Sequence, residues 1–200
     1  MKTIDMRFDS NLIQSWIGKS FVKYKCDAFE FTNSVTQIVG LYIGDEVYAL
    51  TNEQEVVDYF GATDDMAVAK LSATEDSMIK SAFKDVEMVS TPVGEEITSV
   101  KMVNEQQTMA INGEPAYEVW LTRAIIFEVG GREISFEKDT VPFSEEITIQ
   151  RGYDLIDKIS FALSLMPLPE MPITFSFPNI SIILSREISG TQAIIGNVDT

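Results

Sequence analysis

Hydrophobic and polar residues alternate most regularly between Tyr117 and Gln150, and this stretch predicts the central element of the fold. The apolar positions of its first half recur with period two, which is typical of a strand with a buried face. These positions are Tyr117, Val119, Leu121, Ile125, Phe127 and Val129. The pair Gly130–Gly131 can supply the positive φ angles of a two-residue turn. We therefore predict a long strand, a hairpin, a returning strand and a third short strand at 147–150.

Three further turn signals predict hairpins elsewhere in the chain. Gly44–Asp45 separates apolar runs at 38–43 and 46–50, Asn112–Gly113 precedes the central strand, and Ser189–Gly190 separates 180–188 from 192–198. Additional short strands are expected within 4–8, 21–24, 66–71, 86–89 and 97–103. Strands therefore account for most of the predicted elements.

Four segments show helical rather than alternating spacing of apolar residues, at about 10–17, 52–60, 74–84 and 153–163. Ser10 is one predicted N-cap and either Thr51 or Asn52 is another, with Glu55 at the capping-box distance from Asn52. The third segment carries acidic residues in its first turn and lysines near its end, which suits the helix dipole. The combined pattern predicts an α+β fold, a mainly antiparallel β-sheet of hairpins with about four short helices packed on it.

The length of 200 residues suits one domain, and we predict a single α+β domain over 1–200. The proline and glycine around 91–94 and the proline-rich stretch 166–172 are the two places where a subdivision is conceivable. The one cysteine, Cys26, precludes an intrachain disulfide and fits a reducing compartment. The first ten residues lack the apolar run of a secretory signal, so the predicted location is the cytoplasm.

Charge is the most unusual global property of the sequence. Fifteen basic residues oppose 31 acidic ones, for a net charge of −16, and no basic residue occurs between Lys25 and Lys70. Such a field repels nucleic acids and anionic membranes, and it favours encounter with a basic protein. The residues predicted to form this acidic surface are Asp45, Glu46, Glu53, Glu55, Asp58, Asp64 and Asp65. The simpler alternative is that the charge serves solubility alone.

The sequence contains no histidine, which excludes every mechanism that relies on a histidine base and the common zinc sites. The acidic doublets lack the spacing of a preorganised calcium loop, and no glycine-rich phosphate-binding motif is present. The spacing Ser77-x-x-Lys80 is that of serine acyl-transferases, but no companion motif accompanies it. We therefore predict neither a cofactor nor a metal site.

Arg123 breaks the apolar face of the central strand, and Trp120 lies on the opposite face beside further apolar residues. Both faces are thus largely apolar, so this strand is expected to be covered on both sides. A buried guanidinium needs a carboxylate or another reason to be there. Trp120 and Arg123 therefore mark a candidate ligand pocket. By contrast, Glu128 and Glu133, which face each other across the hairpin turn, are expected to lie in water.

Three functional hypotheses follow from these patterns. The first is a non-catalytic protein-interaction module, of inhibitor or immunity type, that uses the acidic surface. The second is a small-molecule-binding protein, or an enzyme independent of histidine, with a pocket near Trp120 and Arg123. The third is a structural subunit that completes its core in an oligomer.

Overall fold

The protein consists mostly of β-strands joined by short turns. A computed structural model describes residues 1–28, 34–59, 62–112, 114–139, 144–159 and 180–189. The strands are β1 (Lys2–Met6), β2 (Ser20–Asp27), β3 (Ser34–Thr36), β4 (Ile38–Ile43), β5 (Glu46–Tyr59), β6 (Ala62–Thr74), β7 (Met88–Ile111), β8 (Glu114–Val129), β9 (Arg132–Lys138), β10 (Glu146–Gly152) and β11 (Ile180–Ser189). The helical elements are α1 (Ser10–Gln14) and two 3₁₀-helices, η2 (Asp76–Met78) and η3 (Leu155–Lys158).

The predicted α+β class is wrong, because strands predominate and no helix in the described ranges reaches seven residues. The antiparallel sheet of hairpins is confirmed. The turns predicted at 44–45, 112–113 and 130–131 each join two paired strands in the expected register. Gly130 and Gly131 have φ angles of 55° and 74°, as a type I′ turn requires. The strand predicted at 192–198 lies outside the described residues.

The helix predicted at 52–60 is instead the second half of strand β5. This strand pairs with β6 through thirteen consecutive residue pairs. The apolar residues that suggested a helix include Val56 and Val57, whose branched side chains favour strands. A long partner strand satisfies the backbone of this segment, so tertiary pairing overrides the local helical spacing.

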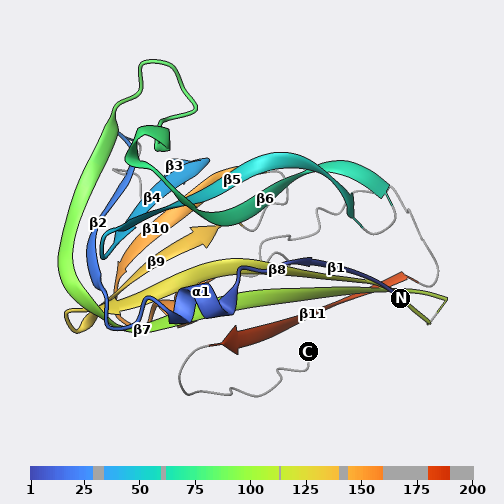
Figure 1. The fold of residues 1–200 in the computed structure, drawn as a ribbon. Coiled ribbons are helices and arrows are strands. Elements are labelled where there is room, and N and C mark those ends of the chain that lie inside the picture. Colours follow the sequence, from blue (N-terminus) through green and yellow to red (C-terminus); the bar gives the residue numbers. More distant parts are fainter. Residues whose placement is uncertain (29–33, 60–61, 113, 140–143, 160–179, 190–200) are drawn as a thin grey trace.

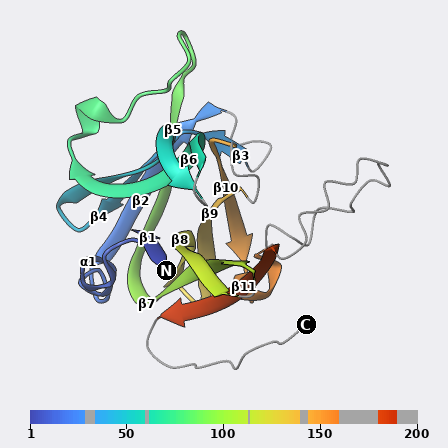
Figure 2. The same ribbon diagram turned by 90° about the vertical axis from the view of Figure 1, so that its right-hand side faces the viewer.

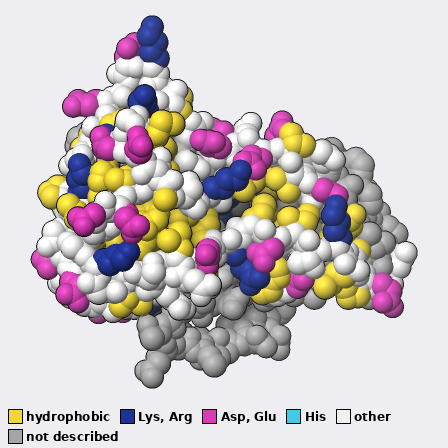
Figure 3. All heavy atoms as spheres, viewed as in Figure 1, with side chains coloured by type: hydrophobic (Ala, Val, Ile, Leu, Met, Phe, Trp, Pro, Cys, Tyr) yellow, Lys and Arg dark blue, Asp and Glu magenta, His cyan; other side chains and the backbone are white. Residues whose placement is uncertain are grey.

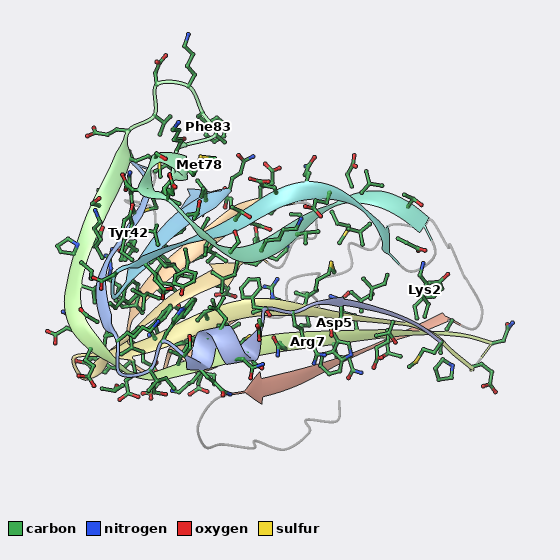
Figure 4. The ribbon with its side chains drawn as sticks, viewed as in Figure 1. Lys2, Asp5, Arg7, Tyr42, Met78 and Phe83 are labelled. Carbon is green, nitrogen blue, oxygen red and sulfur yellow. The ribbon has the colours of Figure 1, made fainter. Side chains whose placement is uncertain are left out.

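The helix predicted at 74–84 reduces to the single turn η2. The sequence pattern predicts that Met78, Ile79, Ala82 and Phe83 face inward, but only Ile79 is buried, where it packs against Gly40 of β4. Met78 and Phe83 are 63% and 48% exposed and project from the segment that joins β6 to β7 (Figure 4). Because Met78 and Phe83 stay largely exposed, the segment gains little burial from a helical conformation.

The remaining two helices are shorter than predicted. In α1 the N-cap is Asp9 rather than Ser10, since the Asp9 carboxylate accepts from the backbone N–H of Asn11. The predicted helix at 153–163 is represented by η3, and its last residues lie outside the described ranges. Both elements bury apolar residues, so the sequence pattern located the contacts while overestimating helix length.

The strands form one sheet with the order β3-β10-β9-β8-β7-β2-β4-β5-β6, while β1 and β11 add to β8 and β7. All pairs are antiparallel except β1 with β8. The first part of β7 pairs with β2 and the second with β8. Figures 1 and 2 show β7 bending between these two partners. The end of the sheet at β3 also lies next to β4 along the chain. Strand β3 pairs with β10 and strand β4 pairs with β2, so the short connection between β3 and β4 brings these two parts of the sheet together.

Strand β7 spans two strands that the sequence predicted separately, and it crosses the residues 91–94 without interruption. The proline-rich stretch 166–172 lies outside the described residues. A single domain therefore stays a prediction for the whole chain.

Aromatic side chains fill the space between the two facing parts of the sheet. The Phe21 ring of β2 lies 4.8 Å from the Phe127 ring of β8, and Tyr24 meets Phe136 of β9 edge-on at 5.4 Å. Trp16, which follows α1, is fully buried and stacks on Phe127 at 5.8 Å. Each such side chain contributes roughly 1.5–3 kcal/mol through burial, so this cluster is the main source of stability.

The outer face of the central strand is also covered, as the sequence predicted. Ala124 and Ile126 of β8 pack with Val103 of β7 and with Leu155 and Ile159. The element η3 thus closes the face opposite the aromatic core.

Candidate functional site

Arg123 lies at a β-bulge in β8. Two consecutive residues of β7 pair with Ala124 and Thr122, so Arg123 is an extra residue with no opposite partner. A bulge changes the direction in which neighbouring side chains point. Consequently Leu121, Thr122 and Arg123 line one cavity, which strict alternation along a strand would not allow.

The bulge coincides with a change of partner along one edge of β8. That edge pairs with β9 from Ala124 onward and with β1 up to Leu121. The Arg123 guanidinium spans the break, since its Nη1 donates to the carbonyl of Asp139, just beyond the end of β9. Arg123 thus satisfies a backbone acceptor that regular strand pairing leaves open.

Four charged side chains gather at this break, and we call them the Arg123 cluster: Arg123, Glu105, Glu137 and Lys138. Arg123 Nε lies 3.4 Å from Glu105 Oε2, and its Nη2 lies 3.8 Å from Glu137 Oε1. The three side chains are only 2%, 1% and 9% exposed. Burial of ions is costly unless they are paired, and the two carboxylates supply that pairing.

The Arg123 cluster borders a cavity of about 30 Å³ between the sheet around β8 and the overlying strand β6. Its lining residues are Met6, Met66, Ala67, Val68, Ala69, Glu105, Gln107, Leu121, Thr122, Arg123 and Lys138. A cavity needs roughly 10–15 Å³ for one water molecule, so this one admits about two. Its wall is apolar on the β6 side and charged on the β7–β8–β9 side.

Two groups at the cavity retain hydrogen-bonding capacity within the described residues. Glu105 Oε1 accepts from the Gln107 amide, while Glu105 Oε2 is buried and accepts no hydrogen bond. Lys138 Nζ donates to the Asp139 carbonyl at 3.3 Å, and an ammonium has three hydrogens to donate. An unsatisfied buried polar atom costs about 1–3 kcal/mol, so such atoms call for a physical reason.

Lys138 has a strongly perturbed acidity. Burial, together with the nearby Arg123 charge, lowers the pKa of its ammonium to about 8, against the opposing effect of Asp139 and Glu105. With this pKa, roughly one Lys138 side chain in ten is neutral near pH 7 and the rest are charged. A neutral amine can accept a proton or attack a carbonyl carbon, and it does so without any histidine.

The sum of charges indicates the kind of molecule that suits the cavity. Two cations and two carboxylates leave the Arg123 cluster neutral, so a charged ligand would introduce an uncompensated buried charge. A neutral molecule with both an acceptor and a donor avoids this cost. Its acceptor would face Lys138 and its donor would face Glu105 Oε2.

Trp120 does not belong to this cavity. Its ring lies under the Arg7 guanidinium, whose carbon is 4.5 Å from the ring centroid. Arg7 in turn donates to both carboxylate oxygens of Asp5, at 2.9 and 2.6 Å (Figure 4). The pocket expected near both Trp120 and Arg123 thus has Arg123 in its wall, while Trp120 is part of a surface stack.

The predicted acidic surface is distributed over the turn before β5 and the β5–β6 hairpin. Lysines of this chain pair with three of its residues: Lys19 with Glu46 at 2.9 Å, Lys70 with Glu55, and Lys2 with Asp58. Asp45, Glu53 and Asp65 are exposed, and the side chain of Asp64 lies outside the described set. Figure 3 shows charges of both signs interspersed on the face it presents, so this face is not uniformly acidic.

The prediction that Glu128 and Glu133 form a solvated pair is wrong for Glu133. The two residues are directly opposite, as expected, but Glu133 is buried beside η3. Burial alone would raise the pKa of Glu133, yet hydrogen bonds from Lys101 Nζ at 2.6 Å and Leu155 N–H at 2.7 Å outweigh it and lower the pKa. Lys101 of β7 and Leu155 of η3 create this environment, which the hairpin pattern could not show.

Three members of the Arg123 cluster were not singled out from the sequence. Glu105 follows an apolar run in β7 and looks like an exposed strand residue. Glu137 and Lys138 end β9 as adjacent opposite charges, a common surface pattern. The one sequence signal was Arg123 itself, as a charge on an apolar face.

Comparisons with protein-family models, with curated proteins and with solved structures found no match. Within the described ranges, no group of three or more acidic or cysteine side chains is placed to hold a metal ion. None of the helices in that part of the chain has the length and hydropathy needed to span a bilayer.

Proposed function

We propose that this protein binds a small neutral polar molecule at the cavity beside the Arg123 cluster. The observation that carries the proposal is the buried ion pair of Glu105 Oε2 with Arg123 Nε at 3.4 Å, in which neither atom makes a hydrogen bond within the described residues, at a cavity that the Lys138 ammonium also lines. A bulge and a change of strand partner converge there, and β-bulges are frequent next to functional sites.

The ligand class follows from charge and size. A primary amide, a urea or a hydroxyketone offers a carbonyl to Lys138 and an N–H or O–H to Glu105. The cavity of about 30 Å³ accommodates only a polar head of a few heavy atoms. Any apolar remainder would lie against Met6, Met66 and Leu121, which complete the lining. Binding without turnover is the minimal form of this proposal, and the Lys138 amine would serve as the base if turnover occurs.

The test is saturation-transfer NMR with acetamide, urea and hydroxyacetone as probes, with acetate as the charged comparison. We expect the neutral probes to receive saturation from the protein, and Glu105→Gln and Lys138→Met to reduce the signal. Lys80→Met, which changes an exposed lysine outside the cavity, serves as the matched control. Equal signals from the wild type and both cavity variants would contradict the proposal, and a signal from acetate alone would refute the ligand class.

A role for the acidic surface in binding a basic protein remains a second proposal. Asp45 and Glu53 favour it, because both are exposed and make no ion pair within the described ranges. Native mass spectrometry of the protein purified from its host, at low and then moderate salt, separates the two proposals. A retained mass of small-molecule size supports the cavity, whereas a basic protein lost as salt rises supports the acidic surface.

A cytoplasmic location belongs to the same set of proposals and is supported by the single cysteine, the buried thiol Cys26.

A further inference from the structure

Lys138 continues the core-facing side of β9. Ile134 and Phe136, four and two residues before it, project from the same face of the strand and are buried in the aromatic core. Lys138 is itself only 8% exposed. A lysine thus occupies a position where the strand pattern favours a third apolar residue, and it lines the cavity beside the Arg123 cluster.

The surroundings of Lys138 favour a nucleophilic amine. Burial and the nearby charge of Arg123, which lines the same cavity, both lower the pKa of the lysine. The side chains of Met6, Met66 and Leu121 give this cavity an apolar wall. Burial in an apolar pocket beside a second cation is a recurrent way in which proteins activate a lysine to attack a carbonyl group.

The charges of the Arg123 cluster restrict the product that such an attack can form. The cluster is neutral when Lys138 is charged, because two cations balance Glu105 and Glu137. An imine keeps this balance, since its protonated nitrogen carries the same single charge as the ammonium. Acylation of the lysine, or its reaction with carbon dioxide, would replace the cation with a neutral or anionic group and leave a net negative charge in a buried cluster.

We propose that Lys138 forms an imine with a small neutral aldehyde or ketone that carries a neighbouring hydroxyl group. This inference rests on the proposed function, because it names the reacting group and the substrate class of the same cavity. The ligand hydroxyl donates to Glu105 Oε2, a buried atom at the cavity that accepts no hydrogen bond within the described residues.

The reaction balances without an oxidant, a reductant or a cofactor. The lysine nitrogen bonds to the carbonyl carbon, and the bond between that carbon and its oxygen breaks. Two of the three ammonium hydrogens leave with the oxygen as water, and the third stays on the imine nitrogen. One ammonium and one carbonyl compound therefore give one protonated imine and one water, with no change in charge.

The cavity volume limits the size of the carbonyl compound. About 30 Å³ holds about two water molecules, so the reacting carbon and its neighbours must be few and small. Glycolaldehyde and hydroxyacetone meet this limit, whereas benzaldehyde carries a ring directly on the reacting carbon. Glyoxylate is small enough, but its carboxylate would bring an uncompensated negative charge into the cluster. These compounds separate the effect of size from that of charge.

Reductive trapping tests the proposal. The folded protein is exposed briefly to glycolaldehyde and sodium cyanoborohydride near neutral pH, and peptide mapping by mass spectrometry gives the labelling rate of each lysine. We expect Lys138 to be labelled at least about tenfold faster than Lys80, which is exposed and lies outside the cavity. The reason is that a pKa of about 8 leaves far more neutral amine than the ordinary lysine value of about 10.4.

Four comparisons identify the cause of this preference. An excess of acetamide should slow the labelling of Lys138 and leave that of Lys80 unchanged, because it occupies the cavity without reacting. Benzaldehyde and glyoxylate should show no preference for Lys138. The preference should also disappear in guanidinium chloride, which unfolds the cavity. Lys138→Arg keeps the positive charge but cannot form this imine, so its whole-protein mass spectrum should lack the rapidly formed adduct.

Labelling of Lys138 no faster than that of Lys80 in the folded protein would overturn the proposal. An equal preference for Lys138 with benzaldehyde would also overturn it, since the cavity would then play no part. The saturation-transfer experiment separates this inference from the proposed function. If acetamide binds but Lys138 is not trapped, the imine is refuted and the binding site stands; if neither occurs, both are refuted.

Discussion

The Arg123 cluster and the acidic surface both bring lysine or arginine together with carboxylates, but in opposite surroundings. Side chains of the Arg123–Glu105 pair are 2% and 1% exposed, whereas those of the Lys70–Glu55 pair are 55% and 38% exposed. Water screens the second pair and is excluded from the first. Ion pairs at a protein surface contribute about 0–1 kcal/mol, whereas removal of one member of a buried pair costs about 3–5 kcal/mol.

The comparison teaches that the abundance of acidic residues is a poor guide to where charge matters. The acidic stretch dominates the sequence, yet lysines of the same chain offset three of its residues. The Arg123 cluster contributes no net charge and is inconspicuous in the sequence. Because the Arg123 cluster is buried at a bulge, we expect substitutions there to reduce stability more than substitutions in the acidic surface.

Arg123→Met is the change with the largest expected effect. Among the described residues it leaves Lys138 as the one cation of the cluster beside the buried Glu105 and Glu137, so we expect a loss of about 3–5 kcal/mol in unfolding free energy. Urea denaturation followed by tryptophan fluorescence measures this loss. Arg7→Met should cost far less, because Arg7 is exposed. The double variant Arg123→Met/Glu105→Gln should recover part of the loss, and strict additivity would contradict a coupled cluster.

Lys138 makes stability depend on pH in a defined window. Its pKa is about 8 in the folded protein and near 10.5 in the unfolded chain, so the unfolded state binds more protons between these values. The unfolding free energy contributed by Lys138 should therefore rise with pH above about 8. The full shift corresponds to about 3 kcal/mol. Urea titrations at pH 7.5, 8.5 and 9.5 should show the rise in the wild type and its absence in Lys138→Met. If the unfolding free energy rises equally with pH in both proteins, groups other than Lys138 cause the rise.

Reversal of three acidic residues, in Asp45→Lys/Glu46→Lys/Glu55→Lys, tests the acidic surface as a binding site. The variant loses two exposed ion pairs, so stability should fall by less than about 2 kcal/mol. If a basic protein binds here, its affinity should be abolished while the fold is retained. Pull-down of the partner found by native mass spectrometry measures this, and unchanged binding would exclude the surface.

A single neutralisation, Glu55→Gln, is expected to have the smallest effect. It removes only the exposed pair with Lys70, which contributes no more than about 1 kcal/mol. Urea denaturation at low and high salt should give nearly the same small difference from the wild type. A loss as large as that of Arg123→Met would remove the distinction between the two regions.

The sequence predicted strands far better than helices, and the reason lies in particular contacts. Alternation at 117–129 and the Gly130–Gly131 turn correctly indicated the β8–β9 hairpin, because both signals are local. Helical spacing at 52–60 was misleading, since β6 supplies a partner for the whole segment. At 74–84 helical spacing was also misleading, since Met78 and Phe83 stay 63% and 48% exposed.

The candidate site was predictable only through Arg123. Its charge on an apolar face signalled a special environment, and the structure places it in a buried ionic cluster. The companions Glu105 and Lys138 come from other strands and meet Arg123 only because a bulge shifts the register.

The continuity of β7 has a consequence for the order in which the protein folds during synthesis. Strand β4 pairs with β2, β5 with β4, and β6 with β5. These partners lie close together along the chain, so they can pair as soon as they leave the ribosome. The edge of β2 then remains open until β7 emerges, and Phe21 and Tyr24 lack their ring partners until β8 and β9 follow. The nascent chain therefore carries an exposed aromatic face through much of its elongation, and the addition of β7, β8 and β9 is the step that closes it.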